Sequence, residues 1–390
     1  MMAIKLAFRN LIGAGLRTWL NVIVLSFAFV VIIWHKGFLD GWDRQARTDM
    51  INWEVGGGQY WQKNYDPYDP FSLTDSHDPI PEKLTELIKK GDLTPILVTQ
   101  GTLYPSGRMQ SILVKGIDPG QKLLALPSAM LDSSSESIPA IIGTSMAAGA
   151  RIKKGDVVTL RWRDKNGAFD ATEIKIAGIF QTNVPSADGS QVWIPIEKLR
   201  QMLLMPGEAT LLISRNAKLD LPVVEGWSFK DKDFLLLEIE NIIKAKTVGG
   251  IILWGILLML AMLAIFDTQV LSIFRRQKEI GTYVAMGMTR KQVVTLFTVE
   301  GAMHSVLAAL LGAVYGIPLL TLQAIKGIAL PVSGSDYGIS MAEKLYPQYS
   351  IGLIVTTVLL VMATTTIVSY WPARKIAKMK PTDALRGKIQ

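Results

Sequence analysis

Four long apolar stretches constrain the fold of this 390-residue chain more than any other feature. They cover residues 18–38, 247–266, 293–322 and 350–371. Each has the ~20 residues that an α-helix needs to cross a hydrocarbon core about 30 Å thick. Charged residues make up only 19% of the chain, whereas soluble proteins usually carry about 25%. The sequence therefore predicts a membrane protein with four transmembrane α-helices.

A long segment, residues 39–246, separates the first two stretches and is long enough for one or two folded domains. It contains 24 Lys and Arg residues against 27 Asp and Glu residues. Its charge is thus nearly balanced, so the net charge of +8 for the whole chain arises elsewhere.

The remaining cations gather in short segments at the ends of the apolar stretches. Three lie in residues 1–17, five in residues 275–292 and six in residues 374–388. If the four helices alternate in direction, these segments share one side of the membrane. Lys and Arg in short loops favour the cytoplasmic side. Both termini and residues 275–289 are therefore predicted to be cytoplasmic, and residues 39–246 extracytoplasmic. Because the cations follow this topology, no nucleic-acid partner is expected.

The N-terminal segment, residues 1–17, carries Ile4, Phe8 and Leu11 at helical spacing. This pattern is typical of a helix that lies in the membrane interface, and a disordered basic tail is the alternative. The apolar stretch that follows exceeds the ~7–15-residue apolar region of a signal peptide. It is therefore predicted to stay uncleaved as a membrane anchor.

The long segment between the first two stretches is predicted to be a mixed α+β domain. Residues 111–118 have the pattern of a strand, and residues 155–180 that of two strands joined at Asn166-Gly167, a strong turn signal. The remaining predicted elements are strands at residues 191–195 and 209–214 and helices at residues 81–90 and 195–205.

Aromatic residues are concentrated early in this domain, beside three consecutive glycines. Trp53, Tyr60 and Trp61 belong to this group. They form either an exposed contact surface for an apolar substrate or partner, or a strand and loop that pack on themselves. The sequence leaves both interpretations open.

No motif for an enzymatic centre is present in the 390 residues. There is no cysteine, and the three histidines lie far apart without a pair at metal-ligand spacing, so no metal site is expected. The G-x-S-x-G nucleophile motif is absent, and so is the G-x-x-x-x-G-K-[ST] loop that binds ATP. The chain is therefore predicted to be non-enzymatic and to bind no cofactor of its own.

Three ionisable residues lie in or beside the apolar stretches, where charge is costly and often functional. Glu300 and His304 are four residues apart and share one helical face, and Asp267 is predicted at a depth similar to that of Glu300. The group is either a polar latch that responds to motion on the cytoplasmic side, or a set of interhelical hydrogen bonds with a hydrated Asp267. Small residues on the third stretch suit close helix packing, within the chain or in a dimer: Gly301, Ala308, Gly312 and Gly316.

Residues 275–289 connect the second and third stretches and carry strong helix-end signals. The second helix is predicted to continue up to Gly287, the left-handed residue that ends it. Thr289 and Gln292 have the spacing of a capping box at the start of the next helix. The segment is thus predicted to be a stiff, charged and partly apolar hairpin tip, suited to docking on another protein.

The same segment, E-I-G-T-Y-V-A-M-G-M-T-R-K-Q from residue 279, closely resembles the signature of ABC-transporter permeases of the MacB/LolC–LolE/FtsX superfamily, the type VII transporters. The stretch L-A-F-R-N-L-I-G-A-G-L-R-T-W-L is similar to the N-terminal elbow of that family. The stretch Y-W-P-A-R-K-I-A-K-M-K-P-T-D-A-L-R is similar to its C-terminal motif. The order of one helix, a large outer domain and three helices also matches.

This resemblance implies four transmembrane α-helices and a large extracytoplasmic α+β domain, the MacB-like periplasmic core domain, inserted between helices 1 and 2. The implied order begins with an elbow helix at 1–17, the first membrane helix at 18–38 and the outer domain at 39–246. The second membrane helix with its stalk follows at 247–274, then a coupling segment at 275–289 and the third membrane helix at 290–322. An outer loop at 323–349, the fourth membrane helix at 350–371 and a tail at 372–390 complete the chain.

The resemblance also implies a dimeric permease in the bacterial inner membrane, served by a dimer of ABC ATPase subunits that bind ATP and Mg. The tip that faces the ATPase would comprise Glu279, Ile280, Gly281, Ala285, Gly287, Met288, Thr289 and Arg290. A C-terminal cytoplasmic motif would brace the tip: Pro372, Ala373, Arg374, Pro381, Ala384, Leu385 and Arg386.

For the cargo, the glycine-rich stretch G-G-G-Q-Y-W-Q resembles lipoprotein-releasing permeases, although Gln59 stands where those proteins often have a histidine. The leading hypothesis is release of lipoproteins from the inner membrane by mechanotransmission. Alternatives are efflux of a small toxic compound or peptide with an adaptor, and FtsX-like signalling to a cell-wall hydrolase. The implied partners besides the ATPase are a second permease copy or paralogue, a periplasmic carrier or adaptor protein, and a lipid or lipoprotein.

Overall fold

The computed structural model describes residues 16–132, 137–216, 222–329 and 344–376, and the contacts divide the chain into two compact units. The helical unit falls within Met1–Trp42, Ile243–Ile328 and Tyr346–Gln390. The mixed unit falls within Asp43–Ile242 and Ala329–Leu345. The elbow predicted at 1–17 lies almost entirely outside the described residues.

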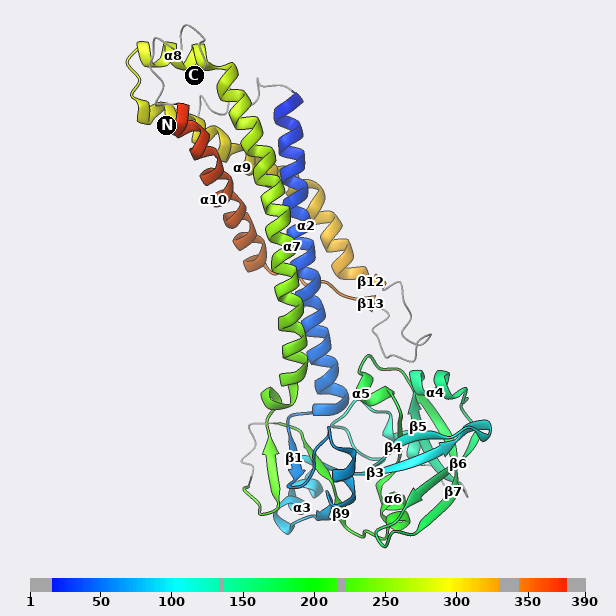
Figure 1. Ribbon diagram of the computed structural model, residues 1–390. Helices are drawn as coiled ribbons and strands as arrows, with labels where there is room; N and C mark the ends of the chain where they lie inside the picture. The colour runs from blue at the N-terminus through cyan, green and yellow to red at the C-terminus, as the bar shows by residue number, and fades with distance from the viewer. Residues whose placement is uncertain (1–15, 133–136, 217–221, 330–343, 377–390) are drawn as a thin grey trace. The chain divides into compact units, whose positions relative to one another are not determined.

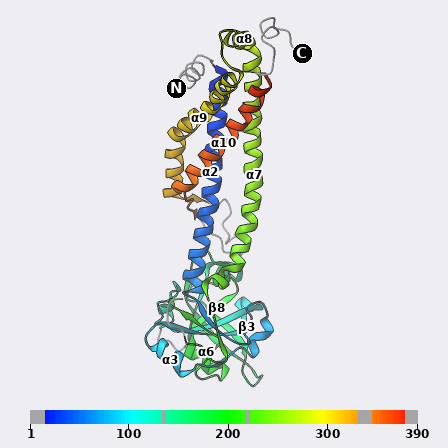
Figure 2. The same ribbon diagram turned by 90° about the vertical axis from the view of Figure 1, so that its left-hand side faces the viewer.

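Long helices build the helical unit (Figure 1 and Figure 2). Those described are α2 (Leu16–Met50), α7 (Lys232–Arg275), α8 (Gln277–Ala285), α9 (Arg290–Lys326) and α10 (Ile351–Ile376). An apolar core joins α2, α9 and α10 through Phe29, Ala308 and Val361, each at most 2% exposed.

Three helical segments are long and apolar enough to cross a membrane: Trp19–Val55, Arg290–Lys326 and Ile351–Arg374. Their mean hydropathies are 2.2, 2.0 and 2.3, and they contain the first, third and fourth predicted spans. The second predicted span falls in α7, whose described residues provide a shorter apolar helix, Thr247–Leu260. A fourth membrane-spanning helix therefore stays a prediction.

The small residues of α9 face α2 within the same chain. A Cβ atom on Gly316 would lie 2.8 Å from the side chain of Val30, and one on Gly312 would lie 3.4 Å from the carbonyl oxygen of Ser26. Tyr315 adds a hydroxyl contact of 3.3 Å to Ser26. Of the two interpretations of this face, close packing within the chain is the one observed.

Both α2 and α7 are longer than the apolar stretches within them. α2 continues to Met50 and then into a π-helix, Ile51–Val55, while α7 begins at Lys232. In the mixed unit, the guanidinium of Arg47 on α2 donates to Glu240 on α7 at 2.8 Å. The apolar stretches mark only part of each helix, because turns stabilised by such ion pairs carry no hydropathy signal.

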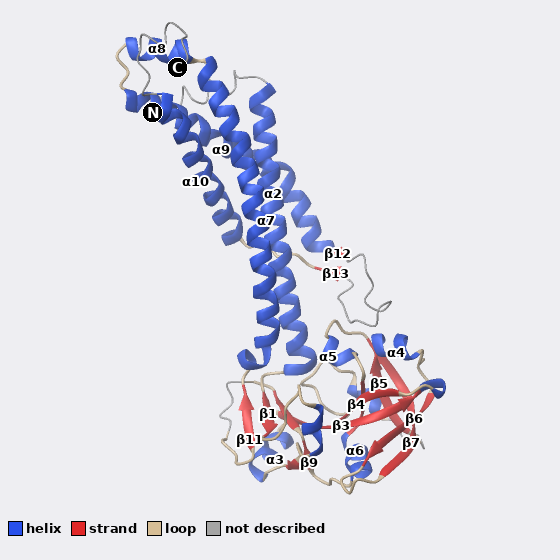
Figure 3. Cartoon of the chain, viewed as in Figure 1, coloured by secondary structure: helices blue, strands red, loops and turns tan. Residues whose placement is uncertain are grey.

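The mixed unit is built on a nine-stranded sheet with the order β11-β1-β10-β3-β4-β8-β5-β7-β6, and Figure 3 shows the strands gathered there. The strands are β1 (Gln59–Gln62), β3 (Leu93–Tyr104), β4 (Gln110–Ile117), β5 (Ile138–Gly143), β6 (Val157–Arg163), β7 (Phe169–Phe180), β8 (Gln191–Pro195), β10 (Leu211–Ser214) and β11 (Trp227–Lys230). Because β3 also pairs with β6, at Gly101 and Trp162, the strands from β3 to β6 close into a barrel.

One apolar core fills this barrel with inward-facing residues of its strands, among them Leu97, Val114, Ile142, Leu160, Ile176 and Val192. A second core covers the opposite face of several of these strands and includes Ile96, Trp193 and Ile213. Alternate residues of one strand thus enter different environments, as the two-residue period of a strand requires.

Most predicted elements of the mixed unit are confirmed. The predicted strands correspond to β4, β6, β7, β8 and β10, and the predicted helices to α3 (Glu82–Lys89) and α6 (Ile196–Leu203). The turn at Asn166-Gly167 joins β6 and β7, with Gly167 at φ 88°. β3 was not predicted from the sequence, although β3 and β7 are the two longest strands of the barrel.

Overpacking the α2–α9 contact is expected to destabilise the helical unit. Gly316→Leu should lower the free energy of unfolding by about 1–3 kcal/mol, because Val30 leaves no room for a side chain. Gly255→Leu on α7 is the matched control, since no heavy atom of the described residues lies within 4 Å of a Cβ there. Denaturation of the full chain in detergent measures both variants, and equal stability would contradict the packing described.

Candidate functional sites

The segment between α7 and α9, here called the helical tip (residues 276–290), lies at one end of the helical unit (Figure 1). α7 ends at Arg275 and α8 begins at Gln277. Arg276 between them has φ −99° and ψ 18°, which interrupts the helix. The prediction of one helix that continues up to Gly287 is therefore wrong: the chain turns at Arg276 and forms a separate short helix.

The end of α8 and the start of α9 are defined by two motifs. Gly287 has φ 98° and its N–H donates to Val284 O at 3.0 Å, while the N–H of Met288 donates to Tyr283 O at 3.0 Å. These two bonds form a Schellman motif. Thr289 and Gln292 then form a capping box, with Thr289 N–H donating to Gln292 Oε1 at 2.8 Å. The predicted helix stop and start are confirmed.

An apolar cluster holds the tip against α9 and α10. Ile280, Val293, Phe297 and Ala373 are each at most 5% exposed and form its centre. Met288, the residue before the N-cap Thr289, packs against them and forms a hydrophobic staple with Val293. The cluster fixes α8 to the helical unit, so the tip is a braced element.

Burial divides the residues predicted to face a partner. Ile280 and Gly281 are buried in α8, so neither residue is available to a partner. Met288 is half-buried, and the remaining predicted residues are exposed: Glu279, Ala285, Gly287, Thr289 and Arg290. Met286 is 69% exposed at the end of α8 and was not singled out from the sequence. The sequence feature that could have pointed to Met286 is its position between the last turn of α8 and Gly287, where the helix ends.

The C-terminal motif is described only in part. Pro372 and Ala373 are buried near the end of α10, and Ala373 touches the cluster under the tip. Arg374 is exposed. The other predicted members lie outside the described residues: Pro381, Ala384, Leu385 and Arg386.

A buried ion pair joins the helix break to α9. Nη1 of Arg276 donates to both carboxylate oxygens of Glu300, at 3.2 Å and 3.1 Å, and its Nε donates to Glu279 at 2.7 Å. Glu300 is 5% exposed, and the guanidinium lies 5.2 Å from the ring centre of Phe297. The arginine that interrupts the helix is therefore also the one that neutralises the buried carboxylate.

The predicted latch between Asp267 and Glu300 is not made. Asp267 is exposed, and Arg276 takes the place next to Glu300. His304 shares a helical face with Glu300 as predicted, but its Nδ1 donates to the backbone oxygen of Glu300 at 2.9 Å. The sequence analysis treated Arg276 only as one of several cations, because its partner is 24 residues away.

The aromatic residues at the start of the mixed unit occupy different places. Tyr60 is 1% exposed, packs against Phe229 at 5.2 Å and donates to Pro222 O at 2.9 Å. Burial raises the pKa of its hydroxyl to about 12. The interpretation of Tyr60 as part of an exposed surface is therefore wrong. Trp53 is half-buried and stacks on Phe180 at 5.6 Å.

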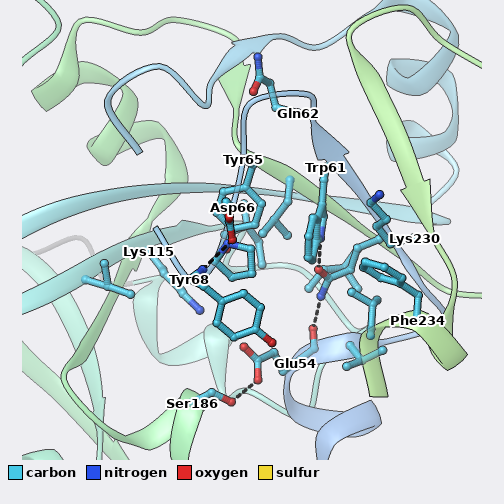
Figure 4. A pocket seen from close by; sticks show the side chains of 18 of the residues that line it. Glu54, Trp61, Gln62, Tyr65, Asp66, Tyr68, Lys115, Ser186, Lys230 and Phe234 are labelled. Carbon is cyan, nitrogen blue, oxygen red and sulfur yellow. Dashed lines mark hydrogen bonds between the residues drawn. The ribbon is translucent and has the colours of Figure 1, made fainter. Parts of the chain in front are cut away.

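Trp61 lies on the opposite face of β1 and lines a cavity of about 900 Å³ (Figure 4). One face of six neighbouring strands forms its floor, together with the loop after β1 and the start of α7. The floor residues are Gln59, Trp61, Ile96, Leu113, Lys115, Gln191, Trp193, Leu211, Ile213, Ser228 and Lys230. The cavity has apolar walls and a few polar groups, which is typical of a ligand site.

The charged residues that line the cavity are Glu54, Lys115 and Lys230 from different elements, with Lys63 and Asp66 on the loop after β1. Figure 4 labels all of them except Lys63. Lys115 is 9% exposed, and its ammonium lies 5.1 Å from the ring centre of Trp193. Burial lowers the pKa of Lys115, and the negative charge of Glu54 partly opposes this effect. The carboxylate of Glu54 accepts a hydrogen bond from the hydroxyl of Ser186.

Comparison with known proteins links the helical part of the chain to one group of permeases. Residues 251–381 match the family described as FtsX-like permease C-terminal. An uncharacterized ABC transporter permease of Methanocaldococcus jannaschii is 30% identical over 169 residues, which cover 41% of this chain and 39% of that protein. Residues 251–381 therefore belong to the permease superfamily that includes MacB, LolC and FtsX.

Two other relatives illustrate the range of this superfamily. The macrolide export ATP-binding/permease protein MacB 2 of Yersinia pestis is 25% identical over 234 residues, which are 56% of this chain and 32% of that protein. The lipoprotein-releasing system transmembrane protein LolC of Xylella fastidiosa is 22% identical over 321 residues, 73% of this chain and 75% of LolC. The chain thus spans less than two fifths of the length of the M. jannaschii and MacB relatives.

Residues 251–381 contain α8, α9, α10 and the C-terminal part of α7. The FtsX-like domain of this chain therefore contains the Schellman motif, the capping box, the apolar cluster and the Arg276–Glu300 pair. With its apolar helices, this membership makes the chain an integral membrane protein.

Removing one partner of the buried ion pair is expected to be costly. Arg276→Leu leaves the carboxylate of Glu300 buried and unpaired, which should lower the free energy of unfolding by about 3–5 kcal/mol. The double variant Arg276→Leu/Glu300→Leu should recover most of that loss. Arg275→Leu, at an exposed neighbouring position, is the control and should change stability by about 0.5 kcal/mol or less. Denaturation in detergent measures all three, and a double variant no better than the single one would contradict the pairing.

Proposed function

We propose that this chain is the transmembrane permease subunit of an ABC transporter and that separate ABC ATPase subunits dock on its helical tip. The observation that carries the proposal is the braced tip inside an FtsX-like domain, which presents Glu279, Met286 and Arg290 to the outside. The 390 residues contain no ATP-binding loop motif, so ATP and Mg would be held by the partner.

The tip has the properties of a docking element. Met286 offers a flexible apolar side chain, which suits it for contact surfaces. Glu279 and Arg290 add charges of both signs around it, which favour one orientation of the partner. The Schellman motif and capping box on either side of Gly287 keep this surface in one shape, so little conformational entropy is lost on binding.

The same contacts offer a path for mechanical coupling. A push on α8 would reach α9 through the Arg276–Glu300 pair and through Ile280, and would reach α10 through Ala373. Packed side chains and ion pairs transmit such displacements because cores resist continuous deformation. This is mechanotransmission: the ATPases do work on the permease from one side of the membrane, and the permease delivers it to the other.

In this proposal α7 is the second of four membrane spans. Both termini and the tip are cytoplasmic, and the mixed unit is extracytoplasmic, in the bacterial inner membrane. The clusters of Lys and Arg at residues 1–17, 275–292 and 374–388 support this orientation.

The cargo of the leading hypothesis is a lipoprotein that is released from the inner membrane, with a second permease copy or paralogue and a periplasmic carrier as partners. The similarity to LolC over 73% of the chain supports it. Efflux of a small toxic compound with a periplasmic adaptor is the second candidate, and the similarity to MacB over 56% of the chain supports it.

Variants that add a charge to the tip or change its backbone conformation test the docking proposal. Met286→Glu should reduce copurification of the ATPase and ATPase-coupled transport at least about tenfold, whereas Met286→Leu keeps the apolar contact and should retain both. Gly287→Leu should also uncouple ATP hydrolysis from transport, since a φ of 98° disfavours residues other than Gly or Asn. Gly287→Asn is its matched control. Normal copurification and coupling in both Met286→Glu and Gly287→Leu would rule out the tip as the docking site.

The topology is tested by reporter fusions in the full chain. A fluorescent protein fused after Gln390 should fluoresce, and alkaline phosphatase inserted between Ser133 and Glu136 should be active, because phosphatase matures only outside the cytoplasm. A dark fluorescent protein at the C-terminus together with inactive phosphatase at residues 133–136 would contradict the proposed orientation.

A further inference from the structure

We propose that the cavity of the mixed unit binds a small amphipathic anion, with its carboxylate or phosphate group held by Lys115 Nζ and Trp193 Nε1. This site goes beyond the proposed function, because it depends neither on the helical tip nor on the choice between lipoprotein and small-molecule cargo.

The register between β4 and β8 brings the two donors together. Lys115 on β4 and Trp193 on β8 are paired residues of neighbouring parallel strands, so their side chains leave the sheet on the same face. That face is the floor of the cavity, and both residues line it. A cation and an indole N–H are thereby placed side by side.

Both donors lack hydrogen-bond partners among the described residues. Trp193 is 2% exposed, and its Nε1 has none there. Lys115 is 9% exposed, and its ammonium lies 5.1 Å from the ring centre of Trp193 without a hydrogen bond or ion pair to any described residue. Buried donors without partners cost free energy, and native proteins rarely leave them so. A ligand oxygen between the two would satisfy both.

Glu54 is the carboxylate whose charge acts on Lys115. It accepts a hydrogen bond from the hydroxyl of Ser186, and it forms no ion pair with Lys115 within 4.0 Å in the described part of the chain. The positive charge of Lys115 is therefore available to an anion that enters the cavity.

The apolar part of the ligand follows from the rest of the lining. Trp61 meets Tyr65 edge-on at 5.2 Å and Phe234 at 6.0 Å, which fixes an aromatic wall. Figure 4 shows Trp61, Tyr65 and Lys115 around the same space. Ile96 and Ile213 contribute aliphatic side chains to the floor of the cavity. A volume of about 900 Å³ exceeds what an inorganic ion needs and lies within the ~300–1,000 Å³ typical of pockets for organic ligands.

One more polar group refines the ligand. Gln191 lines the cavity and is 5% exposed. Its Oε1 has no hydrogen-bond partner among the described residues, while its Nε2 donates to Ser186 O. An oxygen acceptor next to the cationic site calls for a donor on the ligand. A hydroxyl or N–H close to the anionic group would complete the site.

This ligand chemistry has two sources, a single-chain lipid and a water-soluble aromatic acid. Photolabelling of the full chain in detergent separates them. The probes are a diazirine-bearing palmitate and 4-benzoylbenzoate, each compared with its own methyl ester, and labelled peptides are located by mass spectrometry. We expect the acids, and not the esters, to label peptides that contain residues 59–68 or 228–237. Labelling by palmitate alone assigns the lipid source, and labelling by 4-benzoylbenzoate alone assigns the soluble one.

Variants decide whether the anion site is the one described. Lys115→Met should reduce acid labelling at least about tenfold, since a charge-assisted bond is lost. It should not lower the thermal midpoint, because a buried cation is replaced by an apolar side chain. Trp193→Phe, which keeps the ring and removes the N–H, should reduce labelling severalfold. Lys175→Met, at an exposed position of β7, is the control and should label like the parent chain.

Equal labelling of the cavity by acids and esters, or acid labelling unchanged in both Lys115→Met and Trp193→Phe, would overturn the proposal. The tip variant Met286→Glu should label normally. A failure of this site can therefore be distinguished from a failure of the proposed ATPase docking.

Discussion

The buried pair of Arg276 and Glu300 is the interaction on which the helical tip depends. A carboxylate that is 5% exposed in an apolar helix is tolerable only with a partner, and Arg276 reaches it at 3.1 Å from the point where the preceding helix stops. To pair with the carboxylate of Glu300, the chain turns at Arg276 and does not continue outward as one helix. The turn brings Ile280 onto Val293 and Phe297, and the tip becomes part of the helical core.

That arrangement changes how the tip can work. A straight stalk would present all sides of its helix to a partner, whereas α8 buries Ile280 and Gly281 and exposes Glu279 and Met286. Its buried face is continuous with α9 and α10, so a force on the exposed face has a direct route into the membrane helices. The exposed residues of the tip thus serve contact, and its buried residues serve support.

The mixed unit shows a similar division between neighbouring residues. Tyr60 and Trp61 are adjacent and both aromatic, but they leave β1 on opposite faces. One completes a core, and the other lines a cavity. Sequence reasoning could not assign the faces, since it missed β3, whose Pro95 and Gly101 argue against a central strand. In the structure Gly101 is where β3 pairs with both β4 and β6, and a Cβ there would lie 2.8 Å from Val114.

Features that depend on neighbours along the chain could be predicted from the amino-acid order alone. These are the apolar helices, the turn at Asn166-Gly167, the stop at Gly287 and the start at Thr289, because hydrophobic length, left-handed backbone and capping act within a few residues. Features that join distant segments became visible in the folded chain. It paired Arg276 with Glu300, closed the barrel through β3, and set Lys115 beside Trp193. Burial and pairing energies depend on which segments meet in space, and no local pattern records that.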